Sequence, residues 1–131
     1  MNPADIDKAI ETYFNTNWTD TSIAWPNVPF AAPDGSWVRY RNLPDNTNTQ
    51  EVGSSGVGIR EGVVKIQIFT KPNIGGRTGA DLAATAESLF HLQDIGGVYF
   101  RSAYTANNGL NDAGTWYQHT VTAPWWAWVN E

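Results

Sequence analysis

The sequence predicts an α+β domain, in which two principal helices pack on a mainly antiparallel sheet. Two observations indicate this class. Apolar residues recur at helical spacing in two segments, near residues 3–15 and 78–92, and they alternate with polar residues in several segments between and after them. The 131 residues show no internal repeat and match the size of one ordinary domain. We therefore expect a single domain over residues 1–131.

The first helix is predicted over residues 3–15. Asn2 is a favourable N-cap, and Pro3 suits the first helical position. The apolar residues that follow recur at helical spacing and predict one buried stripe: Ile6, Ala9, Ile10, Tyr13 and Phe14.

Strands are expected in the middle of the chain. Residues 23–25 form a short apolar run that Pro26 stops, and residues 37–41 alternate as a strand with one wet face does. Residues 44–58 are polar and rich in glycine, so they form either a flexible loop or the strand ends of a long, weakly held hairpin. The strongest strand pattern covers residues 62–70, and residues 60–62 are predicted to form a turn before it.

The second helix is predicted to begin after an N-cap at Thr78 and to reach about residue 92, where Ile95 and two glycines end it. Its stripe of Leu82, Ala83, Ala86, Leu89 and Phe90 should pack on the strand face formed by Val64, Ile66 and Ile68. Strands follow over residues 98–104 and 115–122, and residues 124–129 read as a final edge strand.

Composition excludes several classes of function. Thirteen acidic and eight basic residues give a formal net charge of −5, which argues against a dedicated nucleic-acid reader. The absence of cysteine excludes disulfides and thiolate metal sites. No apolar run is long enough for a membrane span, and no secretory signal is recognisable, so we expect a soluble protein with no membrane partner.

No catalytic motif is recognisable. His91 falls at the end of the second helix, where a cation favours the helix dipole, and His119 falls in a strand, where we expect a satisfied structural histidine. Residues 73–79 resemble a phosphate loop but lack the Lys-Ser/Thr ending of a P-loop. We therefore expect no catalytic, cofactor-binding or metal-binding residues, and no cofactor.

The aromatic C-terminal segment is more informative. In a strand, Trp126 and Trp128 project to one face and Trp125 to the other. One face should belong to the core. An exposed second face would mark either a subunit interface or a surface on which sugars stack, and both alternatives stay open.

Five segments resemble the tail-terminator-like proteins of long-tailed bacteriophages, which are also described as tail completion or minor tail proteins. They are DIDKAIETYF, IAWPNVPF, DGSWVR, GSSGVGIREGVVKIQIFTKP and GGRTGADLAATAESLF, and in order and spacing they cover roughly residues 5–90. The resemblance implies a non-enzymatic virion protein, made in the host cytoplasm and located at the neck of the tail.

The resemblance also implies partners. Such subunits form a ring, usually a hexamer, on the head-proximal end of the tail tube, where the ring ends polymerisation and contacts the head-completion or connector proteins. DNA would only pass through the lumen. Closed rings need two unlike contact surfaces on each subunit. The candidates are the glycine-rich segment 44–58 and the C-terminal segment, and the interface candidates are Val57, Ile59, Arg60, Trp125, Trp126 and Trp128.

Three rival interpretations remain. A carbohydrate-binding module would need exposed, coplanar tryptophan rings. A small enzyme would need a concave pocket around His119 with a perturbed titratable group. Another ring-forming virion part, such as a head-tail adaptor or a tail-tube subunit, would differ only in what lies above and below it.

Overall fold

The computed structural model describes residues 2–49 and 57–130, and it confirms the α+β class. The helices are α1 (Pro3–Asn17) and α2 (Arg77–Phe90). The strands are β1 (Ser22–Ala24), β2 (Trp37–Thr49), β3 (Val57–Thr70), β4 (Asp94–Ile95), β5 (Val98–Phe100), β6 (Tyr104–Leu110) and β7 (Tyr117–Asn130).

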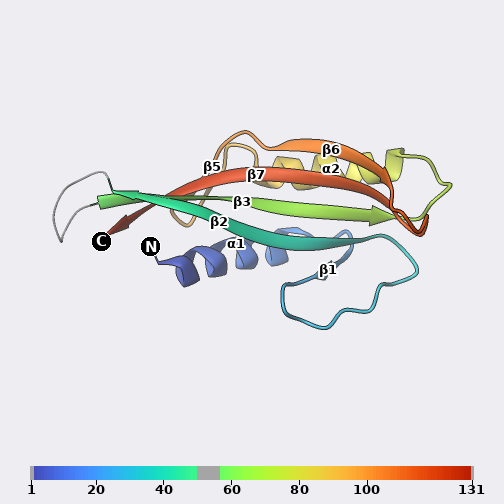
Figure 1. The fold of residues 1–131 in the computed structure, drawn as a ribbon, viewed down its shortest axis with the longest axis horizontal. Helices are drawn as coiled ribbons and strands as arrows, with labels where there is room; N and C mark the ends of the chain where they lie inside the picture. Colours follow the sequence, from blue (N-terminus) through green and yellow to red (C-terminus); the bar gives the residue numbers. More distant parts are fainter. Residues whose placement is uncertain (1, 50–56, 131) are drawn as a thin grey trace.

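Within the described residues, seven strands form one curled sheet in the order β1-β2-β3-β7-β5-β4, with β6 also paired to β7 (Figure 1). The short β1 lies parallel to β2, and the other described pairs are antiparallel. The long strand β7 therefore lies inside the sheet, between β3 on one side and both β5 and β6 on the other.

Helix α1 begins where the sequence predicts. The Asn2 side chain accepts a hydrogen bond of 2.8 Å from the backbone N–H of Asp5, which satisfies one of the free donors at the helix start. The helix runs to Asn17, two residues beyond the prediction, and the N–H of Trp18 still donates to the carbonyl of Phe14 at 2.8 Å.

Helix α2 differs from the prediction at both ends. It begins at Arg77 with Gly76 as the N-cap, and no side chain caps it, so the predicted cap at Thr78 is wrong. It ends at Phe90 because Leu92 has a left-handed backbone (φ 54°) and its N–H donates to the carbonyl of Arg101. The chain beyond the helix is thus held against the residues that follow β5.

The pairing of β2 with β3 contradicts one prediction and decides between the two alternatives left open by another. Residues 60–62 are not a turn, because β3 runs unbroken from Val57 to Thr70 and pairs with both β2 and β7. Residues 44–49 belong to β2, so the hairpin alternative holds there, while residues 50–56 lie outside the described residues. Gly62 allows close packing and does not form a turn, because a Cβ there would lie 2.6 Å from the indole ring of Trp125.

The C-terminal strands also correct the prediction. The strand expected over residues 98–104 is two strands, β5 and β6, and residues 117–130 form the single strand β7, which is not an edge strand. Pro124 fits this interior position because its carbonyl accepts from the N–H of Arg101, on the side away from β3. Since N and C=O of one strand residue point to the same side, the missing N–H of Pro124 faces the gap between β5 and β6.

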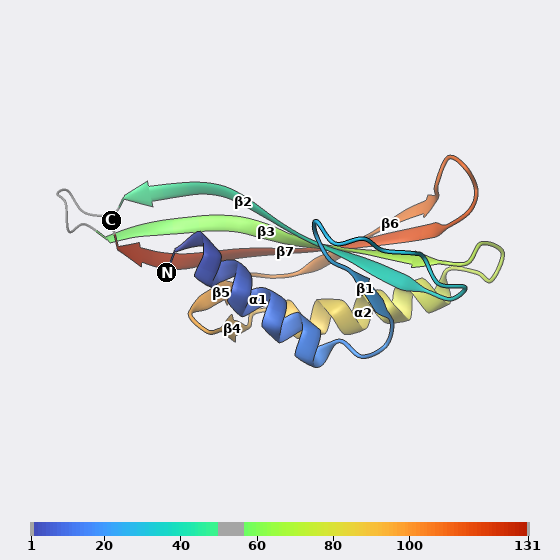
Figure 2. The ribbon, with the colours of Figure 1, turned by 90° about the horizontal axis from the view of Figure 1, so that it is seen from below.

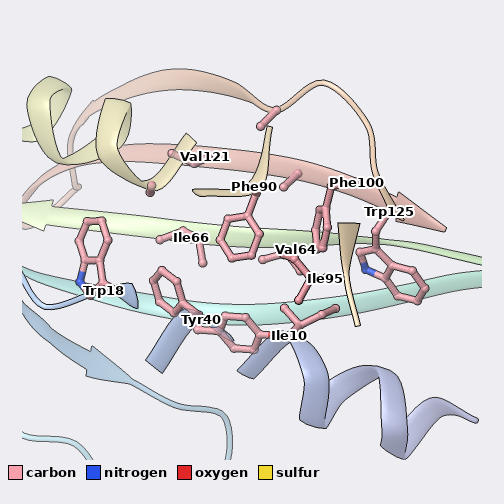
Figure 3. Close-up of a cluster of buried hydrophobic side chains, with 14 of the residues drawn as sticks. Ile10, Trp18, Tyr40, Val64, Ile66, Phe90, Ile95, Phe100, Val121 and Trp125 are labelled. Carbon is pink, nitrogen blue, oxygen red and sulfur yellow. The ribbon is translucent and has the colours of Figure 1, made fainter. Parts of the chain in front are cut away.

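The main core combines both helices with the strands (Figure 3). Val64, Ile66 and Ile68 of β3 lie in one buried cluster with Ala86 and Phe90 of α2, as the sequence predicts. Leu82 and Leu89 are half-buried against this cluster. The buried residues of α1 complete it: Ile6, Ile10 and Phe14. Figure 2 shows α1 and α2 on the same side of the strands.

Candidate assembly surfaces

The tryptophans at the end of β7 point alternately to the two faces of the sheet, as predicted. Trp125 is only 1% exposed and belongs to the core. Its indole N–H donates to Asn42 Oδ1 at 2.9 Å, and Asn42 in turn donates to the carboxylate of Asp7. This chain of hydrogen bonds joins β7, β2 and α1. Trp125 therefore stabilises the subunit and is withdrawn as an interface candidate, because a core side chain cannot contact another protein.

Trp126 and Trp128 lie on the face of the sheet opposite the core, together with Tyr99 of β5. The rings of Tyr99 and Trp126 stack with centroids 4.7 Å apart, and Trp126 meets Trp128 edge to face at 5.4 Å. Trp128 is 47% exposed. We call these three side chains the aromatic patch. A large apolar ring that stays exposed on a folded subunit is a typical contact residue in interfaces.

Of the other predicted interface residues, which lie along β3, Ile59 shares the face of this patch, whereas Arg60 lies on the opposite, core face because it pairs with the fully buried Ala127. Ile59 pairs with Trp128 in the antiparallel register, Arg60 pairs with Ala127, and Val57 pairs with Asn130. Ile59 and Arg60 are both half-buried. The structure thus brings the two predicted interface segments together at one end of the sheet. It does so through strand pairing between residues 67 to 73 positions apart, which the sequence alone does not reveal.

A second surface, which the sequence analysis missed, lies at the β1–β2 edge of the sheet. It is a hollow of about 460 Å³ that we call the edge pocket. Its walls include Trp25, Val28, Phe30, Trp37, Arg39 and Arg41. The sequence held one signal for this pocket: prolines at positions 26, 29 and 33, which keep residues 25–36 from forming regular structure.

The sheet ends at this pocket in an open strand edge. β1 pairs with β2 only as far as Arg39, and no other described strand covers the outer edge of β2 from Tyr40 onward. The exposed guanidinium of Arg39 packs over the rings of Trp37 and Phe69, at 5.8 and 5.4 Å from their centroids. Such an edge is a ready template for pairing with a further strand.

Both histidines have structural positions. His91 follows α2 directly, and its Nδ1 accepts from the N–H of Ala103 at 3.1 Å. His119 is 3% exposed and lies beneath α2, where a Cβ on Gly79 would approach within 2.4 Å of its Nδ1. Among the described residues, that Nδ1 has no hydrogen-bond partner, so the prediction of a satisfied histidine is wrong there. Burial lowers the pKa of His119.

The positions of His119 and of the exposed tryptophans argue against the small-enzyme and carbohydrate-binding interpretations. A buried His119 beneath α2 offers no access to a substrate. The rings of Trp126 and Trp128 stand at 84° to each other, which does not provide the coplanar platform that a sugar-stacking surface requires. Among the described residues, no group of three or more His, Asp or Glu side chains could hold a metal ion. In the same part of the chain, neither helix is long and apolar enough to cross a membrane.

The comparison with solved structures shows the fold class of this chain. One solved structure superposes with a TM-score of 0.61 at 19% sequence identity, and the match covers 95% of this chain and 95% of the other. At this identity the likeness shows the fold alone, an α+β domain built on an open, mainly antiparallel sheet. No curated protein matches the sequence significantly.

The family model described as "Phage tail terminator protein" matches residues 5–125. The chain therefore belongs to the phage tail terminator family, and the resemblance noted in the sequence is confirmed. Members of this family are structural components of the phage tail, which points to a protein without catalytic activity.

Proposed function

We propose that six copies of this chain form a closed ring on the head-proximal end of the finished tail tube. The ring stops further polymerisation of the tube and joins the tail to the head. Its partners are other copies of the chain, the tail tube protein, and a head-completion or connector protein, and this places the chain at the neck of the virion. Membership of the terminator family over residues 5–125 is the observation that carries this proposal.

The two unlike edges of the sheet support ring formation. Both helices lie on one side of the sheet (Figure 2). We therefore expect contacts between copies to use the edges of the sheet and its other face. One edge carries β1, the open part of β2 and the edge pocket, whereas the opposite edge carries β6 over half its length and β4 over the other half. Unlike surfaces give head-to-tail contacts, which close into a ring when the rotation between copies allows it.

The aromatic patch suits contacts along the axis of the ring. Tyr99, Trp126 and Trp128 gather at one end of the long strands, beside Ile59, and away from the edge pocket at the other end. We assign this patch, with Val57 and Ile59, to the contact with the tube protein or the head protein. A contact of this kind uses aromatic anchors and leaves the two sheet edges free for neighbouring copies.

The acidic composition fits a lumen through which DNA passes. A formal net charge of −5 limits adhesion to phosphate, so DNA would move through the ring without being held. In this proposal DNA is cargo in transit and not a ligand.

Negative-stain imaging and light scattering of the purified chain, alone and mixed with tail tubes, test the proposal. We expect closed rings at one end of each tube, and tubes that no longer elongate when more tube protein is added. Monomers alone, even with tubes present, would contradict it. Rings that bind only the portal side of the head, and never the tubes, would instead indicate a head-tail adaptor.

A further inference from the structure

The outer strands β1 and β6 lack the residues that usually protect a solitary edge strand. They lie at opposite edges of the sheet (Figure 1), and among the described residues no strand pairs with the outer edge of either one. Solitary edges are usually protected by lysine or proline. β1 and β6 contain neither, and six of the seven residues of β6 are exposed. A bulge interrupts β6 only between Asn107 and Gly109, so its first four residues form a regular open edge.

β1 and β6 lie at the same level of the sheet, because rows of paired residues run from one to the other. Ala24 of β1 pairs with Arg39 of β2, which pairs with Gln67 of β3. Gln67 pairs with Thr120 of β7, and Thr120 pairs with Ala106 of β6. A contact between residues of one row adds no rise from copy to copy, so a series of such contacts can close into a ring.

The strand directions also suit a contact between β6 of one copy and β1 of another. β6 is antiparallel to β7, β7 to β3, and β3 to β2, whereas β1 is parallel to β2. β6 therefore runs antiparallel to β1. In the proposed ring the aromatic patch at one end of the long strands faces along the axis, so the strands follow the axis. All copies of a ring point the same way, and neighbouring edges would therefore meet as antiparallel strands.

The adjoining row holds two exposed side chains that have no partner within the described part of the subunit. Arg41 pairs with Lys65, Lys65 pairs with Thr122, and Thr122 pairs with Tyr104. Paired residues point to the same face, so Arg41 and Tyr104 both lie on the face opposite the core, at opposite edges. Tyr104 is 57% exposed, and Arg41 is also exposed. Neither side chain forms a hydrogen bond, ion pair or ring contact with another described residue.

Arg41 belongs to a cluster of positive charge. Lys65 lies directly opposite it, and Arg39 lies two residues along β2 on the same face. Among the described residues, none of the three forms an ion pair. Like charges directly opposite each other destabilise a sheet, and a cation is attracted to the face of an aromatic ring. Arg39 already has such a ring, that of Trp37, with 5.8 Å between the guanidinium carbon and the ring centroid. Arg41 has none within the described subunit.

We propose that β6 of one copy lies antiparallel against β1 of the next, with the Tyr104 ring stacked on the Arg41 guanidinium. This inference rests on the proposed ring, and it names the contact that joins the copies. Arg41 lies in the part of β2 that β1 leaves uncovered, and Tyr104 is the first residue of β6. In the joined sheet their strands would be two spacings apart, about 10 Å, which an arginine and a tyrosine side chain bridge together.

The side-chain contact is tested by exchange in the full chain. Tyr104→Arg places two cations together, and we expect the concentration at which half of the chains are in rings to rise at least about tenfold. Adding Arg41→Tyr to that variant should restore assembly, and Tyr104→Phe should assemble like the parent. Ile74→Arg is the matched control, because Ile74 is 54% exposed and follows the end of β3, level with the far end of β6. All variants are first checked for an unchanged thermal melt.

The strand contact is tested independently by cross-linking, which is clean because the chain has no cysteine. Ser22 of β1 and Ala106 of β6 are both exposed and lie on the same face, two rows apart. Chains with Ser22→Cys are mixed with chains carrying Ala106→Cys and treated with a reagent that spans about 10 Å. We expect cross-linked dimers, which only neighbouring copies can give. Ile74→Cys in place of Ala106→Cys should give none.

The outcomes separate this inference from the proposed function. If Tyr104→Arg forms rings at the parent's concentration, or if adding Arg41→Tyr brings no recovery, the stacking is overturned while the ring stands. Rings that dissolve equally with Ile74→Arg would overturn it as well. Normal rings without cross-linked dimers of the Ser22 and Ala106 variants would overturn the strand contact. If the parent forms no ring even on tubes, both proposals fail.

Discussion

Replacing Phe90 by alanine removes the side chain on which the two helices and β5 meet. Phe90 is fully buried, and its ring lies 5.8 Å from that of Tyr13, 5.7 Å from that of Phe14 and 5.1 Å from that of Phe100, measured between centroids. Truncating a buried phenylalanine to alanine typically costs about 3 to 5 kcal/mol. The three aromatic contacts place this site at the upper end of that range. We therefore expect a loss of about 5 kcal/mol.

Such a loss is comparable with the whole stability of a marginal domain, which lies at about 5 to 15 kcal/mol. For a chain of this size each kcal/mol corresponds to about 3 to 5 °C, so the melting temperature should fall by roughly 15 to 25 °C. Urea and thermal melts followed by tryptophan fluorescence measure the change. Leu92→Ala, which alters an exposed leucine just beyond the helix, should change stability by less than about 0.5 kcal/mol. A Phe90→Ala protein as stable as the parent would refute the core assignment.

Three further predictions follow from other contacts. Gly62→Ala should destabilise the subunit by about 1 to 3 kcal/mol, because a Cβ would collide with the Trp125 ring and the Leu43 carbonyl, whereas Gly35→Ala, with open space around it, should be neutral; equal melts for the two would contradict this. Asn2→Ala should cost about 0.5 to 2 kcal/mol in the same melts through loss of the α1 cap, and no change would show that the cap is dispensable. Burial lowers the pKa of His119, so the unfolded chain binds a proton more readily, and stability should fall as the pH drops below about 6.5. A His119→Gln variant should lose this part of the pH dependence, and an unchanged profile would rule His119 out as its source.

Local signals in the sequence were sufficient where a structural role is decided by near neighbours. The N-cap at Asn2 depends on an amide three residues away, and the buried face of β3 depends on alternation within the strand, so both could be predicted. Gly62 could not. Its neighbours in the chain suggest a turn, but the ring that excludes a side chain there belongs to Trp125, 63 positions later in β7. The interior position of Pro124 was hidden for the same reason, because only the gap between β5 and β6 makes its missing N–H harmless.

The assembly surfaces show the same division between local and distant information. Alternation along one strand was enough to separate Trp125 from Trp126 and Trp128, although the sequence could not tell which side is the core. The hydrogen bond from Trp125 to Asn42 decides that question, because it anchors this indole beneath the sheet and leaves the other two rings on the opposite face. The edge pocket had no counterpart in the sequence pattern. Its walls come from a proline-rich loop and from β2, which the pairing of β1 with β2 brings together. A surface that strand pairing builds can be recognised only once that pairing is known.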